Sequence, residues 1–162
     1  MEKVSIVMGS QSDWEVMQHA ARHLQDFGIA FEARVISAHR SPDLLIEYVR
    51  DAEARGAQCF IAGAGAAAHL AGVIASKTQL PVLGVPMPSK YLNGMDSLLS
   101  TVQMPKGIPV ATFAIGEAGA ANAGLFAVAM FARTNTELAA ALSEFRKNQA
   151  DKIAATELPA LP

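Results

Sequence analysis

Short apolar runs alternate along this chain with longer amphipathic segments, and that alternation limits the possible folds more than any other feature. The apolar runs occupy residues 4–8, 31–36, 59–62, 81–85 and 110–115. A helical pattern follows each run, and runs that are apolar at nearly every position are typical of parallel strands buried on both faces. The sequence therefore predicts an α/β fold built on a parallel sheet.

Signals for helix ends support this prediction. Residues 12–15, Ser-Asp-Trp-Glu, have the spacing of a capping box, and the helix that follows should end at Gly28. A second helix should begin at Ser41, with Pro42 in its first turn, and end at Gly56.

The last third of the chain is predicted to be helical. A helix rich in Ala and Gly should span residues 117–133, where small side chains allow close helix packing. A capping box at residues 134–137 should begin a final helix that continues to about residue 151. We expect a single domain over residues 1–155 and a disordered tail at residues 156–162.

Composition narrows the class of protein. The chain is 51% hydrophobic and only 17% charged, below the usual charged share of about 25%, which favours a homo-oligomer that covers apolar surface. The net charge is −2 without a basic stripe, so nucleic acid is not an expected partner. The single cysteine, Cys59, and the absence of a leader indicate the cytoplasm. No apolar run is long enough to span a membrane.

The loops after the strands are the expected site, because parallel sheets bind ligands at the carboxyl ends of their strands. The first loop, Gly9-Ser10-Gln11-Ser12-Asp13, leads into a helix N-terminus, which favours an anion such as phosphate. Ser12 has two open interpretations, phosphate contact or helix cap. Asp13 would repel a phosphate, so it either accepts hydrogen bonds from sugar hydroxyls or stabilises the first helical turn.

The second loop, Ser-Ala-His-Arg-Ser-Pro at residues 37–42, carries the main catalytic candidate. Arg40 can form paired hydrogen bonds to a phosphate, and Ser37 or Ser41 can add a hydroxyl. His39 suits a general acid/base because imidazole titrates near neutral pH and a helix start does not call for histidine. The alternative is an exposed loop histidine without a role.

The third loop, Gly-Ala-Gly-Ala-Ala-Ala-His at residues 63–69, resembles a dinucleotide-binding fingerprint only formally. It does not follow the first strand, and no acidic residue lies between Glu53 and Asp96, so a nicotinamide cofactor is not expected. Its small residues offer a backbone wall for a flat ring. His69 either closes that pocket or packs beneath it.

No metal site is expected. His19 and His23 have the spacing of a zinc-binding pair on a helix, but no third ligand is evident, and a solvated helix face is the preferred interpretation. Cys59 is interpreted as a small core residue. Gly63 stands where a phospho-receiver domain needs an aspartate, which argues against that class.

Six motifs carry a resemblance to a known family. GSQSD, SAHRSP, AGAGAAAHLAG, PVLGVP, GMDSLLSTVQMPKGIPV and AIGEAGAANAG occur in this order between residues 4 and 152. Together they resemble the 5-(carboxyamino)imidazole ribonucleotide mutases of purine biosynthesis. The resemblance implies a three-layer αβα sandwich of flavodoxin-like topology, assembled as an octamer, that needs no metal or cofactor.

The resemblance also implies roles for individual residues. It assigns catalysis to His39 and substrate contacts to Ser10, Asp13 and Arg40. The other residues expected in the substrate site come from the same three loops: Ser12, Ser37, Ala38, Ala64, Gly65, Ala66, His69 and Leu70. Bacterial members of the family often have a second glycine where Ala66 stands and a proline where Ala71 stands.

The implied reaction moves a carboxylate within one ribonucleotide. Carbon dioxide leaves the exocyclic nitrogen, stays confined beside the ring and is attacked by the neighbouring ring carbon, while His39 transfers a proton in each half of the reaction. Three alternatives remain open. They are a carboxylase that adds free carbon dioxide to aminoimidazole ribonucleotide, an FMN-binding flavodoxin-like protein, and a noncatalytic nucleotide-binding module.

Overall fold

The apolar runs form one parallel five-stranded sheet in the computed structural model, which describes residues 2–161. The strands are β1 (Lys3–Met8), β2 (Ala30–Val35), β3 (Cys59–Ala64), β4 (Val82–Pro86) and β5 (Ala111–Thr112). Their order, β2-β1-β3-β4-β5, is that of flavodoxin-like proteins, which confirms the predicted topology.

Strand β5 is shorter than the apolar run that predicted it. Regular pairing covers only Ala111–Thr112 of residues 110–115. Two further backbone bonds follow, from Phe113 N–H to the Gly84 carbonyl and from Gly116 N–H to the Pro86 carbonyl, both at 2.9 Å. The chain thus continues alongside β4 without keeping strand geometry.

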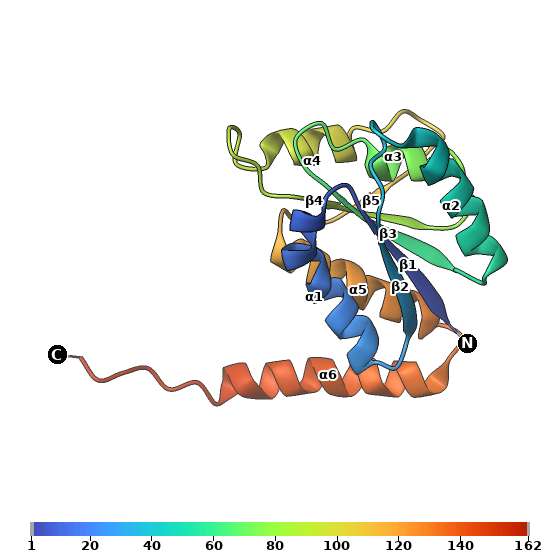
Figure 1. Cartoon of the computed structure of the whole chain (residues 1–162). Helices are drawn as coiled ribbons and strands as arrows, with labels where there is room; N and C mark the ends of the chain where they lie inside the picture. The colour runs from blue at the N-terminus through green and yellow to red at the C-terminus, as the bar shows by residue number, and fades with distance from the viewer. Residues whose placement is uncertain (1, 162) are drawn as a thin grey trace.

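Helices cover both faces of the sheet in three layers (Figure 1). Helices α1 (Trp14–Asp26) and α5 (Glu117–Phe131) lie on one face. The other face carries α2 (Pro42–Ala54), α3 (Leu70–Ala75) and α4 (Met95–Val102). The last helix, α6 (Thr136–Ala154), lies outside the α1–α5 layer. The predicted αβα sandwich is therefore confirmed.

Two hydrophobic clusters, one on each face, hold the layers together. Neighbouring residues of β1 point to opposite faces, so that Ile6 belongs to the cluster beneath α1 and α5 and Val7 to the cluster beneath α2 and α3. This explains why the strands are apolar at nearly every position. Cys59 is buried in the first cluster, as predicted, and burial raises the pKa of its thiol to about 12.

The start of the first helix differs from the prediction. A 3₁₀ turn, η1 (Gln11–Asp13), precedes α1, and its cap is Ser10 rather than Ser12. The Ser12 N–H donates to Ser10 Oγ at 3.4 Å, while the Asp13 carboxylate accepts from the Ser10 N–H at 3.0 Å. Ser10 and Asp13 also have the serine-to-acid spacing of a capping box, so two candidate boxes overlap in this loop.

The capping groups at the starts of α2 and α6 also differ from the prediction. Ser41 precedes α2 as predicted, but its hydroxyl donates to the Ser37 carbonyl at 3.0 Å instead of accepting from the helix. The cap of α6 is Asn135 rather than Thr134, because the Asn135 side-chain oxygen accepts from the N–H groups of Glu137 and Leu138, each at 3.1 Å. The predictions that the first two helices end at Gly28 and Gly56 agree with the structure. Both residues have positive φ angles, of 68° and 91°, as is typical of the glycine that follows a helix.

Small residues bring α5 against α1. A side chain at Gly124 would place its Cβ 2.8 Å from the Ala20 carbonyl oxygen, so these helices pack at a distance that only glycine permits. The expected close packing is confirmed. The small residues of this helix that pack inside the sandwich are Gly119, Ala120, Ala123, Gly124 and Ala127, all of them buried within the chain.

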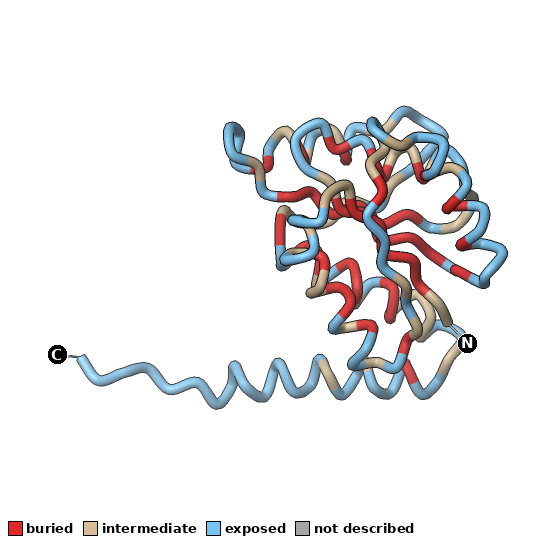
Figure 2. Tube along the Cα trace, viewed as in Figure 1, coloured by how far each residue is buried: buried red, intermediate tan, exposed pale blue. Residues whose placement is uncertain are grey.

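Helix α6 projects from the body of the protein. Figure 2 shows most of it exposed, and the chain continues away from the sandwich after its end. Phe145 anchors the helix through edge-to-face contacts with His23 and Phe27, each with ring centroids 5.7 Å apart. Residues 156–161 are exposed and lack regular structure.

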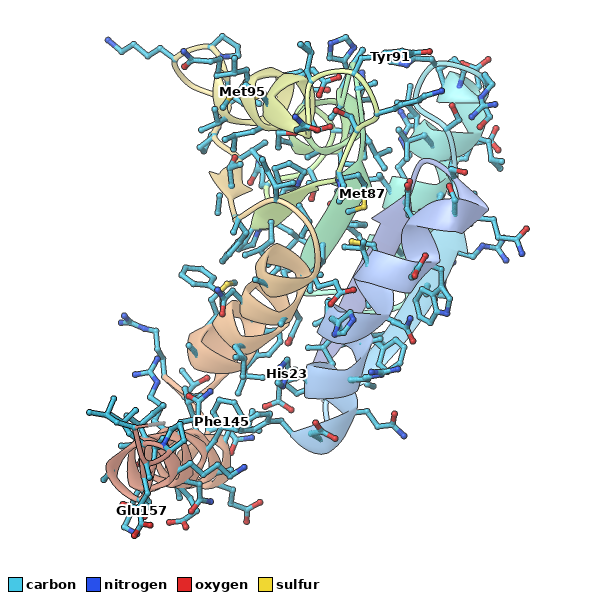
Figure 3. The ribbon with its side chains drawn as sticks, turned by 90° about the vertical axis from the view of Figure 1, so that its left-hand side faces the viewer. His23, Met87, Tyr91, Met95, Phe145 and Glu157 are labelled. Carbon is cyan, nitrogen blue, oxygen red and sulfur yellow. The ribbon has the colours of Figure 1, made fainter. Side chains whose placement is uncertain are left out.

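Of the two histidines of α1, His19 is partly exposed, whereas His23 does not lie on a solvated face, which corrects the prediction for that residue. His19 Nε2 lies 3.6 Å from a Glu117 carboxylate oxygen, and His23 packs against Phe145 (Figure 3). Burial lowers the pKa of His23. Within residues 2–161 we find no group of three or more side chains suited to hold a metal ion. None of the helices described there has the length and apolar character needed to cross a membrane.

Candidate active site

A pocket of about 220 Å³ lies where the first three strands end. Strand β1 is flanked by β2 and β3, so the loops that follow these strands meet at one edge of the sheet. This is the switch point at which such sheets bind ligands. The pocket is lined by Gly9, Ser10, Asp13, Ser37, Ala38, His39, Arg40, Ala64, Gly65, Ala67 and Leu70.

The structure brings most of the predicted site residues together, but three of them do not line this pocket. The Ser12 hydroxyl is exposed and bonds to the Ser10 hydroxyl at 2.9 Å. Ala66 and His69 belong to the pocket's supporting loop rather than to its lining. Conversely, Gly9 and Ala67 line the pocket without having been predicted, although each stands inside a motif that was singled out.

The first loop is organised around Asp13. Its carboxylate accepts the Ser10 N–H at 3.0 Å and at the same time lines the pocket. Burial raises the pKa of Asp13, while hydrogen bonds from the backbone of Ser10 and Gly9 oppose that change. Asp13 therefore closes the loop and also offers a hydrogen-bond acceptor to a ligand, which accommodates both interpretations of this residue.

The second loop holds Arg40 through Ser37. The Ser37 hydroxyl accepts from the Arg40 N–H at 3.1 Å and lies 3.4 Å from Arg40 Nε. The Ser37 carbonyl accepts from the Ser41 N–H at 2.9 Å, which fixes the turn into α2. Arg40 thus brings a positive charge to the pocket from a side chain whose base is held by its neighbours.

The third loop joins the second through a pair of histidines. His39 Nε2 lies 2.8 Å from His69 Nδ1, and the two rings are nearly perpendicular, with an interplanar angle of 89°. When both rings are neutral, one nitrogen of this pair donates and the other accepts, so each ring fixes the tautomer of the other. His69, itself exposed, therefore contacts the candidate acid/base directly without lining the pocket.

The rest of the third loop is a wall of small residues. Ala64, Gly65 and Ala67 line the pocket, and a Cβ at Gly65 would come within 3.1 Å of Met87 Cβ. Met87 is buried and points inward, whereas Tyr91 and Met95 lie at the outer end of the next loop and helix (Figure 3). Ala66 has a φ of 55°, in the left-handed region that favours glycine.

Sequence reasoning missed the contribution of α4 to this region. The Ala66 N–H donates to Ser97 Oγ and the Ala68 N–H to Ser100 Oγ, both at 2.9 Å. These serines stand within the motif GMDSLLSTVQMPKGIPV but carry no signal of their own, because serine on a helix usually faces solvent. Only the three-dimensional fold places them beside the third loop.

Comparisons with known proteins agree over almost the whole chain. The sequence model of the family described as AIR carboxylase matches residues 3–152. The chain is 58% identical over 151 residues to the N5-carboxyaminoimidazole ribonucleotide mutase of Brucella melitensis, with 93% of each chain covered. It is 52% identical over 160 residues to the mutase of the same name from Saccharolobus solfataricus, covering 99% of this chain and all of the relative.

A solved structure shares the fold and the extent of the chain. The crystal structure of Treponema denticola PurE matches with a TM-score of 0.87 and 28% sequence identity, and covers 95% of both chains. On this evidence the chain belongs to the AIR carboxylase family.

Proposed function

We propose that this protein is an N5-carboxyaminoimidazole ribonucleotide mutase. The reaction moves the carboxylate of the substrate from its exocyclic nitrogen to the neighbouring ring carbon during purine biosynthesis. The observation that carries the proposal is the presence of His39, Arg40 and a wall of small residues in one pocket. The full-length relatives named for this activity, at 52% and 58% identity, support the same conclusion.

The pocket offers a group for each part of a ribonucleotide. Arg40 and the hydroxyls of Ser10 and Ser37 suit the phosphate, because guanidinium binds phosphate through paired charge-assisted hydrogen bonds. The Asp13 carboxylate suits the ribose hydroxyls, which donate hydrogen bonds. The backbone wall at residues 64–67 suits the flat imidazole ring, and Ala38 and Leu70 complete the apolar surroundings. Ser12 contributes indirectly, through its bond to Ser10.

The chemistry is an isomerisation, so atoms and electrons balance without an oxidant or reductant. The N–C bond to the carboxylate breaks and the nitrogen gains a proton. A C–C bond forms at the ring carbon, which then loses a proton. Confinement of carbon dioxide beside the ring raises its effective concentration, and fixed geometry of this kind lowers reaction barriers by up to about 7–11 kcal/mol.

His39 would transfer both protons. It lies in the pocket lining and is held by His69 at 2.8 Å, which gives its ring a fixed orientation. An imidazole can donate a proton in the first half of the reaction and accept one in the second, since it titrates near neutral pH. The catalytic role of His39 and the supporting role of His69 are thus parts of one proposal.

The protein is further proposed to act as a cytoplasmic homo-octamer. Large apolar side chains are exposed in the loop after β4 and on α4. They belong to Tyr91, which is 85% exposed, Leu92, Met95 and Leu99. Exposed apolar clusters of this kind are typical of protein interfaces. The pocket, at about 220 Å³, is also smaller than the roughly 300 Å³ at which ligand pockets usually begin. A second copy of the chain could therefore supply further walls.

An isotope experiment separates the mutase from the direct carboxylase. The purified protein is given substrate labelled with ¹³C in its N-carboxylate, in a buffer that contains unlabelled bicarbonate. A mutase keeps the label in the ring-bound carboxylate of the product, whereas a carboxylase that draws on free carbon dioxide loses it. Loss of the label, or no turnover at all, would reject the proposed function.

The two remaining alternatives have tests of their own. A tightly bound flavin would give the purified protein visible absorbance, which the proposal does not expect. A noncatalytic nucleotide-binding module would bind the ribonucleotide without converting it.

A further inference from the structure

Hydroxyl side chains of α4 bind the backbone of the loop that carries His69. Ser97 Oγ accepts the Ala66 N–H at 2.9 Å, and Ser100 Oγ accepts the Ala68 N–H at 2.9 Å. The Ser100 hydroxyl also lies 3.1 Å from the Ala66 carbonyl. Two serine hydroxyls on successive turns of α4 thus bind backbone N–H groups of this loop.

Ser97 holds the least favourable backbone conformation of this loop. Ala66 has a φ of 55°, a conformation that costs free energy for any residue with a Cβ and therefore needs support from its surroundings. The Ser97 side chain is fully buried, with 0% exposure, so water cannot replace its bond to the Ala66 N–H. Without that bond, Ala66 keeps its carbonyl contact with the Ser100 hydroxyl, but the hydrogen bond that holds its N–H against a return to a negative φ is lost.

The loop transmits this constraint to the pocket over a short distance. The Ala68 N–H donates to the Ala66 carbonyl and the His69 N–H donates to the Ala67 carbonyl, both at 2.9 Å, so residues 66–69 form one tight turn. His69 Nδ1 then lies 2.8 Å from His39 Nε2. A change of φ at Ala66 would therefore displace the His69 ring relative to His39.

We propose that Ser97 is a positioning residue for the reaction, acting through the Ala66 backbone and His69 on the orientation of the His39 ring. This proposal rests on the proposed function of His39 as the acid/base. Ser97 itself touches neither the pocket nor the histidines, so its effect should appear in the chemical step rather than in substrate binding.

The direct test is Ser97→Ala. We expect kcat to fall about tenfold and KM to stay within about threefold, because displacement of a catalytic group well below 1 Å costs less than the roughly hundredfold typical of a full ångström. The pH profile of kcat should also change, because the partner that fixes the tautomer of His39 has moved. Ser97→Cys, which keeps a weak acceptor of similar size, should fold and lower kcat less than Ser97→Ala does. It replaces Ser97→Ala as the test if the alanine variant does not fold.

Ser5→Ala is the matched control. Ser5 is also a fully buried serine with one side-chain bond, to the Tyr48 hydroxyl at 2.7 Å, but it lies inside β1. It should lower the melting temperature by a similar amount and leave kcat and the pH profile unchanged. Equal kinetic effects from Ser5→Ala and Ser97→Ala would show that only stability matters, and would overturn the proposal.

A second substitution distinguishes positioning from general damage. Ala66→Gly removes the cost of the left-handed conformation, so Ser97→Ala combined with Ala66→Gly should recover kcat to within about threefold of Ala66→Gly alone. A double variant as slow as Ser97→Ala would reject the proposed route through Ala66. If the unmodified protein converts the substrate and Ser97→Ala has the same kcat, the positioning role of Ser97 is rejected and the proposed function stands. An inactive unmodified protein would instead reject the proposed function.

Discussion

His39 Nε2 and His69 Nδ1 lie 2.8 Å apart, although 30 residues separate them in the sequence. The two side chains come from loops after β2 and β3, strands that β1 separates in the sheet. Each ring restricts the other, so the candidate acid/base does not rotate freely in its loop. The pair explains how a partly exposed histidine can be held ready for proton transfer.

Replacing His69 should slow the reaction without abolishing it. In His69→Asn the fixed orientation and tautomer of His39 are lost while His39 itself remains, so kcat should fall up to about a hundredfold, the scale of a misplaced catalytic group. Steady-state kinetics and the pH profile measure this. His19→Asn, a histidine on α1 away from the pocket, is the control and should leave kcat unchanged. A His69→Asn enzyme with normal kcat would show that the pair has no catalytic importance.

Arg40 should determine substrate affinity. Arg40→Leu removes the cation proposed to bind the phosphate, and losing a charge-assisted pair of hydrogen bonds should raise KM at least about tenfold. The melting temperature should change little, because the Arg40 side chain is exposed. Arg50→Leu, on the solvent side of α2, controls for loss of surface charge. An unaltered KM in Arg40→Leu would remove this residue from the site.

Asp13 should make stability depend on pH in an unusual direction. Its pKa is raised in the folded protein from the ordinary value of 3.8, chiefly by burial. Between the unfolded and folded pKa values the folded state binds more protons than the unfolded state, so the contribution of Asp13 to stability falls as pH rises through that interval. At neutral pH the ionised group is therefore destabilising.

The matching variant is Asp13→Asn, which cannot ionise. It should melt at a higher temperature than the unmodified protein at neutral pH, and the difference should vanish below pH 3.8, the ordinary pKa, where Asp13 is protonated in both states. Its KM should rise, because the ribose loses a charged acceptor. Asp43→Asn, in the first turn of α2, is the control. A melting temperature that falls at neutral pH would contradict the assigned effect of burial.

Assembly can be tested through the exposed apolar residues of the α4 region. Light scattering at micromolar concentration should give about eight times the 17.0 kDa mass of one chain. Tyr91→Glu places a charge in the proposed interface and should reduce that mass, since an unpaired charge is costly to bury. A 17.0 kDa particle from the unmodified protein would reject the oligomer.

The sheet could be predicted from sequence because its signal is local and strong. Strands buried on both faces must be apolar at successive positions, as Ile6 and Val7 illustrate. The helix ends at Gly28 and Gly56 could be predicted because glycine readily adopts the positive φ angles found there. The three ligand loops could be found because topology places them at one edge.

Features that depend on the assembled fold escaped prediction. Ser10 rather than Ser12 caps the first turn because a 3₁₀ turn comes first, and sequence spacing does not distinguish the two overlapping boxes. His23 is partly buried because α6, whose position the sequence does not reveal, packs Phe145 against it. Ser97 supports the third loop from 31 residues away, a contact without a local signal.

The role of His39 as the group that carries the protons is tested by turnover of the ¹³C-labelled substrate with His39→Asn. This change keeps much of the size and hydrogen bonding of the side chain but removes proton transfer at neutral pH. We expect this variant to fold, assemble and bind the ribonucleotide, yet to turn over about two to four orders of magnitude more slowly. Near-normal turnover by His39→Asn would instead show that another group transfers the protons.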